Sequence, residues 1–325
     1  MKIIKVWLFF LALISISSHS AVSTGSIKTI LGDVSLSRDN TILSPEIGME
    51  VFKSDELITG KASSVGVIMK DNTILTAGED SVLNIESFSY DKRSRRGNLR
   101  ANLKRGSLSS ISGHLAKTSP DSVRFKTATM TLGVRGTEFL IDVTDGEKID
   151  TSVILLPEID GTAGVIDVES SLGEITTVDK PFENLVVAQD GSITSSILDS
   201  LSVFSKYCGL LGAQPARPKT YLFYFDDITN NLTEDSLEML EALKSDIKIK
   251  TNPELEIAGY TDNDLSNNEA DALSLILAKR LEDIINLSDD LFESDVVGRG
   301  SRDLLFKSDV QFKDKRNYRV EVVLK

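Results

Sequence analysis

The stretch SVGVIMKDNTILTAGEDSVLNI, residues 64–85, shows the pattern that decides the fold of the first half of the chain. Apolar residues alternate with smaller or polar residues from Val65 to Met69, which is the period of a half-buried strand. A turn-forming Asp-Asn pair follows, and the apolar pattern resumes at Ile74. Several such runs occur at regular spacing over residues 26–193, and they predict an all-β sandwich or roll.

A different pattern begins near Tyr221. YLFYF predicts a strand, and Thr233 then predicts the N-cap of a helix. Asn267 or Asn268 is the expected N-cap of a longer helix, and YRVEVVL closes the chain as a strand. Strands that alternate with helices predict an α+β domain over residues 221–325, with helices on one face of a sheet.

Residues 194–220 are expected to link the two domains. An apolar segment with helical spacing is followed by Pro215 and Pro218, which break regular structure and favour an extended connector. This segment also holds Cys208, the single cysteine of the chain. We expect Cys208 to pack as a small hydrophobic residue. The alternative is a thiol that links two copies in an oxidising compartment.

The N-terminus has the features of a secretory signal peptide, residues 1–20. Two lysines precede a short apolar run, and small residues allow cleavage after Ser20, with Ala21 as the neighbouring option. The apolar run is well short of the roughly 20 residues that a membrane span needs. No other stretch is long enough, so we expect export to the periplasm and no transmembrane span in the mature chain.

Charge and composition exclude several classes of function. The formal net charge is −13, and residues 221–325 hold 23 Asp and Glu against 13 Lys and Arg. Such a domain repels nucleic acid and anionic lipid. One cysteine and, beyond the signal peptide, one histidine (His114) do not make a zinc site, and no phosphate-binding loop of the G-x-x-x-x-G-K type occurs. We therefore expect no metal, no cofactor, no catalytic residues and no enzymatic activity.

The segments RGSLSSISG and VRFKTATMTLGVRGTEFLID are similar to the FecR domain, a β-rich periplasmic module marked by the sequence GxRGTxF. The resemblance runs from about Ser26 to at least Val143. The motif positions in this chain are Gly133, Arg135, Gly136, Thr137, Glu138 and Phe139. We interpret them mainly as structural, with a ligand site as the lesser alternative.

Each motif position has an expected structural role. The two glycines permit backbone angles or close contacts that a side chain would forbid. Phe139 supplies core, and Arg135 either pairs with Glu138 or donates to loop carbonyls.

The resemblance also has an implication for function. FecR proteins relay a signal from an outer-membrane receptor to a cytoplasmic sigma factor, and this needs a membrane-spanning helix ahead of the domain. A predicted signal peptide stands in that place here. We therefore expect the β domain to bind an unknown envelope protein, with sigma-factor control or another periplasmic signalling role as the alternative.

One strongly basic stretch, KRSRRGNLRANLKR at residues 92–105, contains seven basic residues and no acid. A solvated hairpin is the simpler interpretation. The sharper one is a contact with an acidic partner, such as the acidic C-terminal half of the same chain.

Residues 221–325 resemble the OmpA-like peptidoglycan-associated domain. The resemblance rests on IAGYTDND, on Leu273-Ser274, on VGRGSRD and on NYRVEVVL. It implies that Asp262, with Thr261 beside it, takes the ammonium of diaminopimelate in the stem peptide of peptidoglycan. An arginine on the next helix takes the carboxylate, because Arg meets a carboxylate bidentately. Capping of the turn after the strand is the equally weighted alternative for Asp262.

Three residues depart from the family pattern around this pocket. Tyr260 replaces histidine, Ala270 replaces asparagine, and Leu277 stands where the family has its arginine. We expect Leu277 to face the pocket, with a place in the core as the alternative. Arg280 and Arg319 are the cations expected to substitute in part.

The sequence therefore predicts a non-catalytic envelope protein that docks weakly on peptidoglycan and presents its β domain to another protein. The alternative is an interaction module in which peptidoglycan binding is lost.

Overall fold

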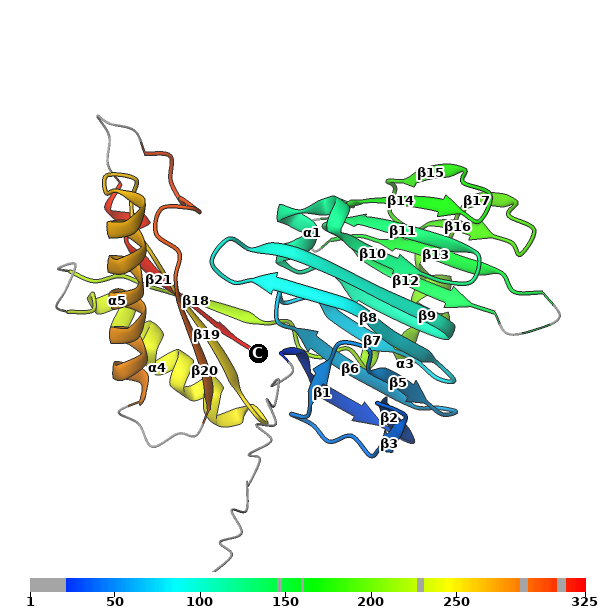
Figure 1. Cartoon of the computed structure of the whole chain (residues 1–325), viewed down its shortest axis with the longest axis horizontal. Coiled ribbons are helices and arrows are strands. Elements are labelled where there is room, and N and C mark those ends of the chain that lie inside the picture. The colour runs from blue at the N-terminus through cyan, green and yellow to red at the C-terminus, as the bar shows by residue number, and fades with distance from the viewer. Residues whose placement is uncertain are drawn as a thin grey trace, which may run out of the picture.

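The computed structural model describes residues 22–325, apart from residues 145, 147, 159–160, 227–230, 287–291 and 309–313. The predicted signal peptide lies outside the described residues. The chain forms an all-β domain followed by an α+β domain, and the two lie side by side (Figure 1). The predicted multidomain fold class is confirmed.

The β domain is a sandwich of two sheets that share one long strand, β9 (Arg96–Ile111). Gly106 lies where β9 passes from one sheet to the other. Its φ is +80°, in the left-handed region that favours glycine. A Cβ at this position would lie 2.4 Å from the Ser81 hydroxyl oxygen, so only glycine fits the crossing.

The first sheet pairs antiparallel throughout and ends at β4 on one side and at β17 on the other. Its order is β4 (Glu50–Phe52), β1 (Ser23–Leu31), β6 (Ser64–Met69), β7 (Ile74–Ala77), β9, β12 (Glu138–Val143), β13 (Thr151–Leu156), β16 (Glu183–Val187) and β17 (Ile193–Ile197).

The second sheet is antiparallel except between β9 and β10. Its order is β3 (Thr41–Leu43), β2 (Val34–Arg38), β5 (Glu56–Thr59), β8 (Val82–Asp91), β9, β10 (Val123–Lys126), β11 (Met130–Arg135), β14 (Val165–Ser170) and β15 (Ile175–Val178). The alternating residues Val65, Val67 and Met69 are buried in the core between the sheets, as the pattern predicts.

Short helices cover the outside of the sandwich. They are α1 (His114–Thr118), the 3₁₀ turn η1 (Pro120–Ser122), α2 (Ser200–Lys206) and α3 (Cys208–Gly212). The last two pack through Val203, Tyr207 and Leu210 against the outer face of the first sheet, at Leu140 and Ile154.

The expected connector, residues 194–220, is not a free tether. Its first four residues belong to β17, and its helices pack on the sandwich. Pro215 lies against Gly66, where a Cβ would approach its ring to 2.5 Å. Arg217 pairs with Glu138 at 2.5 Å. Cys208 is exposed, so the expectation that it packs as a hydrophobic residue is wrong, because α3 turns it away from the sheet.

The α+β domain has one four-stranded sheet with helices on one face (Figure 1). The strand order is β18 (Lys219–Phe223), β21 (Arg319–Leu324), β19 (Glu254–Tyr260) and β20 (Glu293–Gly298), and only β19 and β20 are parallel. The helices are α4 (Glu234–Ile249), α5 (Asn267–Asn286) and the 3₁₀ turn η2 (Lys315–Asn317).

Local signals explain where the two long helices begin. Thr233 caps α4, accepting the Ser236 amide, as predicted. The expected cap of α5 at Asn267 or Asn268 is wrong by one residue: Ser266 precedes the helix, and the Glu269 carboxylate accepts from both its amide and its hydroxyl. This matches the S-x-x-E pattern of a capping box, in which the glutamate of the first turn reaches back to the amide of the residue that precedes the helix.

The two faces of the sheet in the α+β domain differ in chemistry. Leu255 and Ile257 on β19 point to α4 and α5 and form the core. Glu254, Glu256 and Tyr260 alternate with them on the opposite face. That face meets the β domain.

Candidate functional site

The tip of the β8–β9 hairpin carries the start of the basic stretch into the α+β domain. Lys92 pairs with Asp295, and Arg93 lies 3.4 Å from Asp271. The interpretation of this stretch as a contact with the acidic half of the chain is confirmed for these residues. Lys104, further along β9, instead pairs with Glu56 inside the β domain.

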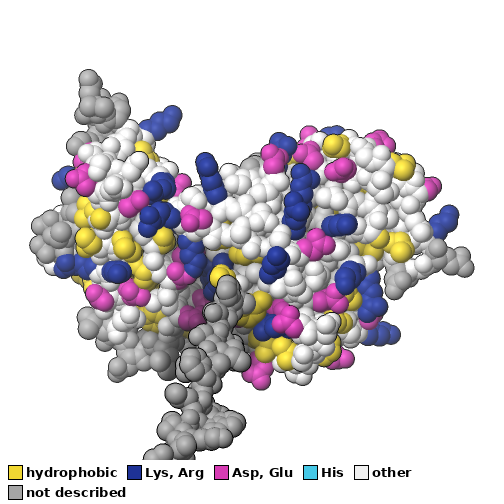
Figure 2. Space-filling view, viewed as in Figure 1, with side chains coloured by type: hydrophobic (Ala, Val, Ile, Leu, Met, Phe, Trp, Pro, Cys, Tyr) yellow, Lys and Arg dark blue, Asp and Glu magenta, His cyan; other side chains and the backbone are white. Residues whose placement is uncertain are grey.

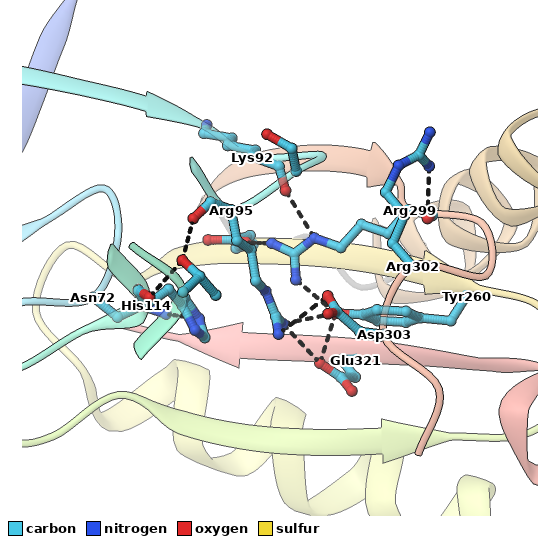
Figure 3. Close-up of polar contacts among 12 residues, drawn as sticks. Asn72, Lys92, Arg95, His114, Tyr260, Arg299, Arg302, Asp303 and Glu321 are labelled. Atoms are coloured by element: carbon cyan, nitrogen blue, oxygen red, sulfur yellow. Dashed lines mark hydrogen bonds and ion pairs between the residues drawn. The ribbon is translucent and has the colours of Figure 1, made fainter. Parts of the chain in front are cut away.

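Tyr260 is the centre of the contact (Figure 3). Its hydroxyl accepts hydrogen bonds from Arg95 at 2.7 Å and Arg299 at 2.5 Å, and it donates to Glu321 at 2.9 Å. Arg319 stacks over its ring at 3.9 Å. Burial raises the pKa of Tyr260 to about 12, so the hydroxyl keeps its proton and remains a donor to Glu321.

Arg299 is the most deeply buried charge of the interface, with 1% of its side chain exposed. Its guanidinium donates to the Lys92 carbonyl at 2.8 Å and to Glu256 at 2.7 Å, as well as to Tyr260. Burial opposes the charge on Glu256, but Lys325 and Arg299 outweigh it and hold the pKa of Glu256 below its usual value. Arg299 and Glu256 thus compensate each other within the α+β domain, and the bond to the Lys92 carbonyl is the contact of Arg299 that crosses to the β domain.

A second group of contacts lies at the other end of β19. Glu254 accepts from Lys28 at 2.8 Å and from Ser26, and Lys70 lies 3.8 Å away. Asn252 donates to the Ile47 carbonyl at 2.7 Å. The α+β domain is therefore fixed to the β domain at two points along one strand.

A polar cavity of about 200 Å³ lies between these two points. Lys70 and Lys92 from the β domain and Glu256 and Lys325 from the α+β domain are among its lining residues. Burial lowers the pKa of both Lys92 and Lys325. The cavity is lined by charges of both signs, and Figure 2 shows the same mixture of signs over the outer surface.

Asp262, the predicted ligand for the ammonium, is completely buried. Its carboxylate accepts from the Ser308 hydroxyl at 2.7 Å, the Asp314 amide at 3.0 Å and the Asn317 side chain at 3.2 Å. Thr261 is also completely buried. Asp262 therefore holds together the loops that follow β19. This role agrees with the alternative in which Asp262 caps the turn after the strand, and it reaches further along the chain than a single turn.

Leu277 lies in the core and not in a pocket. It is 1% exposed and belongs to the apolar cluster between the helices and the sheet. The expectation that it faces the pocket is wrong, because its helical spacing places it on the same stripe as Leu281. Ala270 is equally buried, and a Cβ at Gly300 would lie 3.2 Å from it.

Arg280 is not brought to Asp262. Glu282, two residues further along α5, accepts from Ser294, which pairs with Leu255 near the start of β19. Asp262 follows the other end of that strand. Arg280 therefore lies on the part of α5 that runs toward the start of β19, and its expected role as a substitute for the family arginine stays a prediction.

Arg319 lies near Asp262 but is engaged elsewhere. It pairs with Glu321 at 2.8 Å, donates to the Asp303 carbonyl at 3.0 Å and is 2% exposed. It is linked to Asp262 only through Asn317, whose carbonyl it approaches at 3.4 Å. The four candidate residues for peptidoglycan thus do not form one open pocket.

The FecR motif has a structural role in most of its positions. Gly136 has φ +61°, and Phe139 packs edge-on against Phe125 in the core. Thr137 is completely buried, and its amide donates to the Ser112 hydroxyl at 2.9 Å.

Two expectations for the motif are wrong. Arg135 pairs with Asp167 on the neighbouring strand at 2.9 Å, while Glu138 pairs with Arg217, because residues 135 and 138 lie on opposite sides of the turn at Gly136. Gly133 has neither a positive φ nor a close neighbour, since a Cβ there would be 3.9 Å from the nearest atom.

His114 lies at the start of α1, near the interface. Its Nε2 is 3.1 Å from the Asn72 side-chain nitrogen. Burial, reinforced by the Arg95 charge, lowers its pKa to about 3. Among the described residues no group of three or more His, Cys, Asp or Glu side chains is arranged to hold a metal. None of the described helices is long and apolar enough to cross a bilayer.

The interface residues Arg299, Glu256 and Glu321 were not singled out from the sequence. A signal was present, because ELEIAGY places charged residues on the strand face opposite its apolar residues. That pattern alone cannot distinguish a solvated face from one that pairs with another domain.

Comparison with known proteins gives one family match, FecR protein, at residues 55–155. A search of curated proteins found no match.

Among solved structures, a candidate anti-sigma factor from Parabacteroides distasonis covers 58% of this chain and 73% of its own, at 16% identity and a TM-score of 0.34. The peptidoglycan-associated lipoprotein from Burkholderia pseudomallei covers 33% of this chain and 90% of its own, at 17% identity and a TM-score of 0.27. The OmpA-like domain of FopA1 from Francisella tularensis covers 74% and 98%, at 13% identity and a TM-score of 0.24.

These superpositions are partial and add nothing to the fold described above. The family match falls within the β sandwich and includes the GxRGTxF segment. The β domain of this chain is therefore a FecR domain over residues 55–155.

Proposed function

We propose that the chain is a non-catalytic protein of the bacterial periplasm that acts by binding another envelope protein, with its two domains joined into one rigid unit. The observation that carries this proposal is the pair of buried bonds between the domains, from Arg299 to the Lys92 carbonyl and from Arg95 to the Tyr260 hydroxyl. A domain that docks on the cell wall from a flexible tether would leave this face of its sheet in solvent.

The geometry around Asp262 supports the same proposal. Capture of a zwitterion needs an accessible carboxylate and an accessible cation at a fixed separation. Asp262 has no exposed surface, Leu277 offers no donor, and Arg319 is already paired with Glu321. The family chemistry for a diaminopimelate stem peptide is therefore not presented by the described residues.

Weak docking on peptidoglycan is the second candidate. It is favoured by one observation: a surface cavity lined by Leu304, Leu305, Lys307 and Ser308 adjoins Asp262, to which Ser308 donates. A rearrangement of that segment would expose Asp262 and bring Lys307 near it.

Co-sedimentation of the full chain with purified diaminopimelate-type peptidoglycan separates the two. We expect the protein to stay in the supernatant, while a peptidoglycan-associated lipoprotein run in parallel sediments. Sedimentation that Asp262→Ala abolishes, and that Lys104→Ala as a surface control leaves intact, would establish the second candidate instead.

A separate experiment tests whether the two domains form one rigid unit. Small-angle scattering of the full chain should fit the side-by-side arrangement of Figure 1. A distribution of extended shapes would contradict the proposal, whatever the sedimentation result.

A further inference from the structure

The last strand of the sandwich, β17 (Ile193–Ile197), is an open edge. It pairs with β16 on one side, and no other described strand pairs with it. It lies at the end of the β domain away from the α+β domain (Figure 1). An edge strand presents unpaired amides and carbonyls that can template another strand.

The backbone register shows which groups are free. Ala188 and Leu198 donate to Ser192 and Phe182, so these pairs are hydrogen-bonded between β16 and β17. Bonded and non-bonded positions alternate in an antiparallel pair. Thr194 and Ser196 therefore face β16, and the amides and carbonyls of residues 193, 195 and 197 point outward.

This edge lacks the charges that three other edges of the molecule, β4, β18 and β20, carry. The sequence ITSSI contains no charge and no proline. By contrast β4 carries Glu50, β20 carries Glu293 and Asp295, and β18 carries Lys219. Charges on edge strands commonly prevent pairing between chains, and β17 is longer than the uncharged edges β3 and β15.

The edge is also complementary to itself. We propose that β17 pairs antiparallel with β17 of a second copy of this chain, about a two-fold axis at Ser195. In that register Ser195 faces Ser195 of the other copy, and Ile193 faces Ile197. All three outward-facing residues then form hydrogen-bonded pairs, and small hydroxyl residues oppose each other at Thr194 and Ser196. The proposal does not depend on what the α+β domain binds.

Exposed apolar side chains beside the edge also favour a second copy of this chain as the partner. Ile197 is 61% exposed, and Leu201 and Phe204 on the helix that follows are 76% and 47% exposed. Figure 2 shows hydrophobic side chains reaching the surface at this end of the β domain. Together with the strand these residues offer an interface smaller than the standard of about 800 Å² a partner, which suits a weak, reversible dimer.

The charge distribution permits this dimer. Of the formal net charge of −13, residues 221–325 hold −10, from 23 acidic and 13 basic residues. That domain lies at the opposite end of the molecule from β17, so the two acidic domains of a dimer stay apart and repel each other little.

A disulfide across the axis tests the proposal and its register. Hydrogen-bonded residue pairs have Cα atoms about 5.5 Å apart, within the range of a disulfide. Ser195→Cys in a Cys208→Ser background should form a covalent dimer under mild oxidation. Thr194→Cys in the same background is the matched control, because residue 194 faces residue 196 of the other copy, and it should link several-fold less.

The unlinked chain supplies the second measurement. Sedimentation velocity should show a reversible dimer with a dissociation constant on the order of micromolar. Ser195→Lys places two like charges on the axis and should shift the protein to monomer. A chain that stays monomeric at a concentration 100-fold above that dissociation constant would overturn the proposal. Disulfide formation to the same extent in Ser195→Cys and Thr194→Cys would overturn it as well.

Discussion

Replacing Arg299 with alanine should destabilise the protein more than any other single change at the interface. The substitution removes a guanidinium whose side chain is 1% exposed and leaves Glu256, 3% exposed, without its hydrogen-bonded partner and with Lys325, 3.7 Å away, as the cation that remains. Breaking a buried ion pair by removing one partner costs about 3–5 kcal/mol. For a protein of this size, each kcal/mol lowers Tm by about 2–4 °C.

Differential scanning calorimetry of Arg299→Ala should therefore show a fall in Tm of about 6 °C or more. Arg302→Ala is the matched control. Arg302 pairs with Asp271 at a site where its side chain is 37% exposed, and exposed pairs contribute about 0–1 kcal/mol. The control should melt close to the unmodified protein.

A double-mutant cycle identifies the partner. If Arg299 and Glu256 act as a pair, the variant that lacks both should lose less stability than the sum of the two single variants, by about 0.5–3 kcal/mol. An Arg299→Ala protein that melts within about 2 °C of the unmodified chain would refute the argument that this buried pair stabilises the sheet face that meets the β domain.

Three further predictions follow from other parts of the structure. Leu277→Arg buries a charge in the core, so it should cost a few kcal/mol of stability and give no gain in co-sedimentation with peptidoglycan. A well-folded Leu277→Arg variant that binds peptidoglycan better, and that loses this gain when Asp262→Ala is added, would restore the pocket interpretation. The pKa of His114 falls from 6.5 to about 3 on folding, so the unfolded chain binds more protons between these values. Stability should fall on acidification through that window by up to about 1.4 kcal/mol per pH unit, and His114→Gln should flatten the slope of Tm against pH. Limited proteolysis should spare the connector around Pro215, which packs on Gly66; rapid release of an acidic C-terminal fragment would show that the domains are independent.

Much of the fold could be predicted from the sequence because it depends on local periodicity. Alternating residues such as Val65 and Met69 marked strands, and Thr233 marked the start of α4. The connector could not be predicted in the same way. Its prolines indicate an extended chain, but whether that chain is free depends on a surface, here Gly66, that is distant in sequence.

The candidate site shows a different limit. Aligning a motif gives the position of a residue but not its surroundings. The alignment at Leu277 identified the missing arginine, and the structure shows that the position is part of the core. Asp262 matches the family aspartate, but its carboxylate oxygens accept hydrogen bonds from Ser308, Asp314 and Asn317, residues that lie about fifty positions later in the chain.

The basic stretch shows what charge can and cannot predict. Its seven basic residues indicated an acidic partner. Only the tip makes that contact, because the β8–β9 register directs residues 92–95 beyond the end of the sandwich and keeps Lys104 beside Glu56. The composition of a stretch therefore predicts the sign of its partner's charge, whereas the individual ion pairs depend on tertiary structure.

The three departures from the OmpA-like pattern lie on two sides of the sheet, Tyr260 on the face that meets the β domain and Ala270 and Leu277 on the side of the helices. A phenol at Tyr260 reaches Arg95, Arg299 and Glu321 at once, and its raised pKa keeps it a donor as well as an acceptor. Ala270 and Leu277 fill space against Gly300 and the core, where a polar side chain would lose hydration without a partner. An exposed pocket for a zwitterion and a sheet face fixed to a second domain make opposite demands on position 260. Tyr260 satisfies the second demand and supports the attachment of the domain to its neighbour, while Ala270 and Leu277 pack on the helix side of the same sheet.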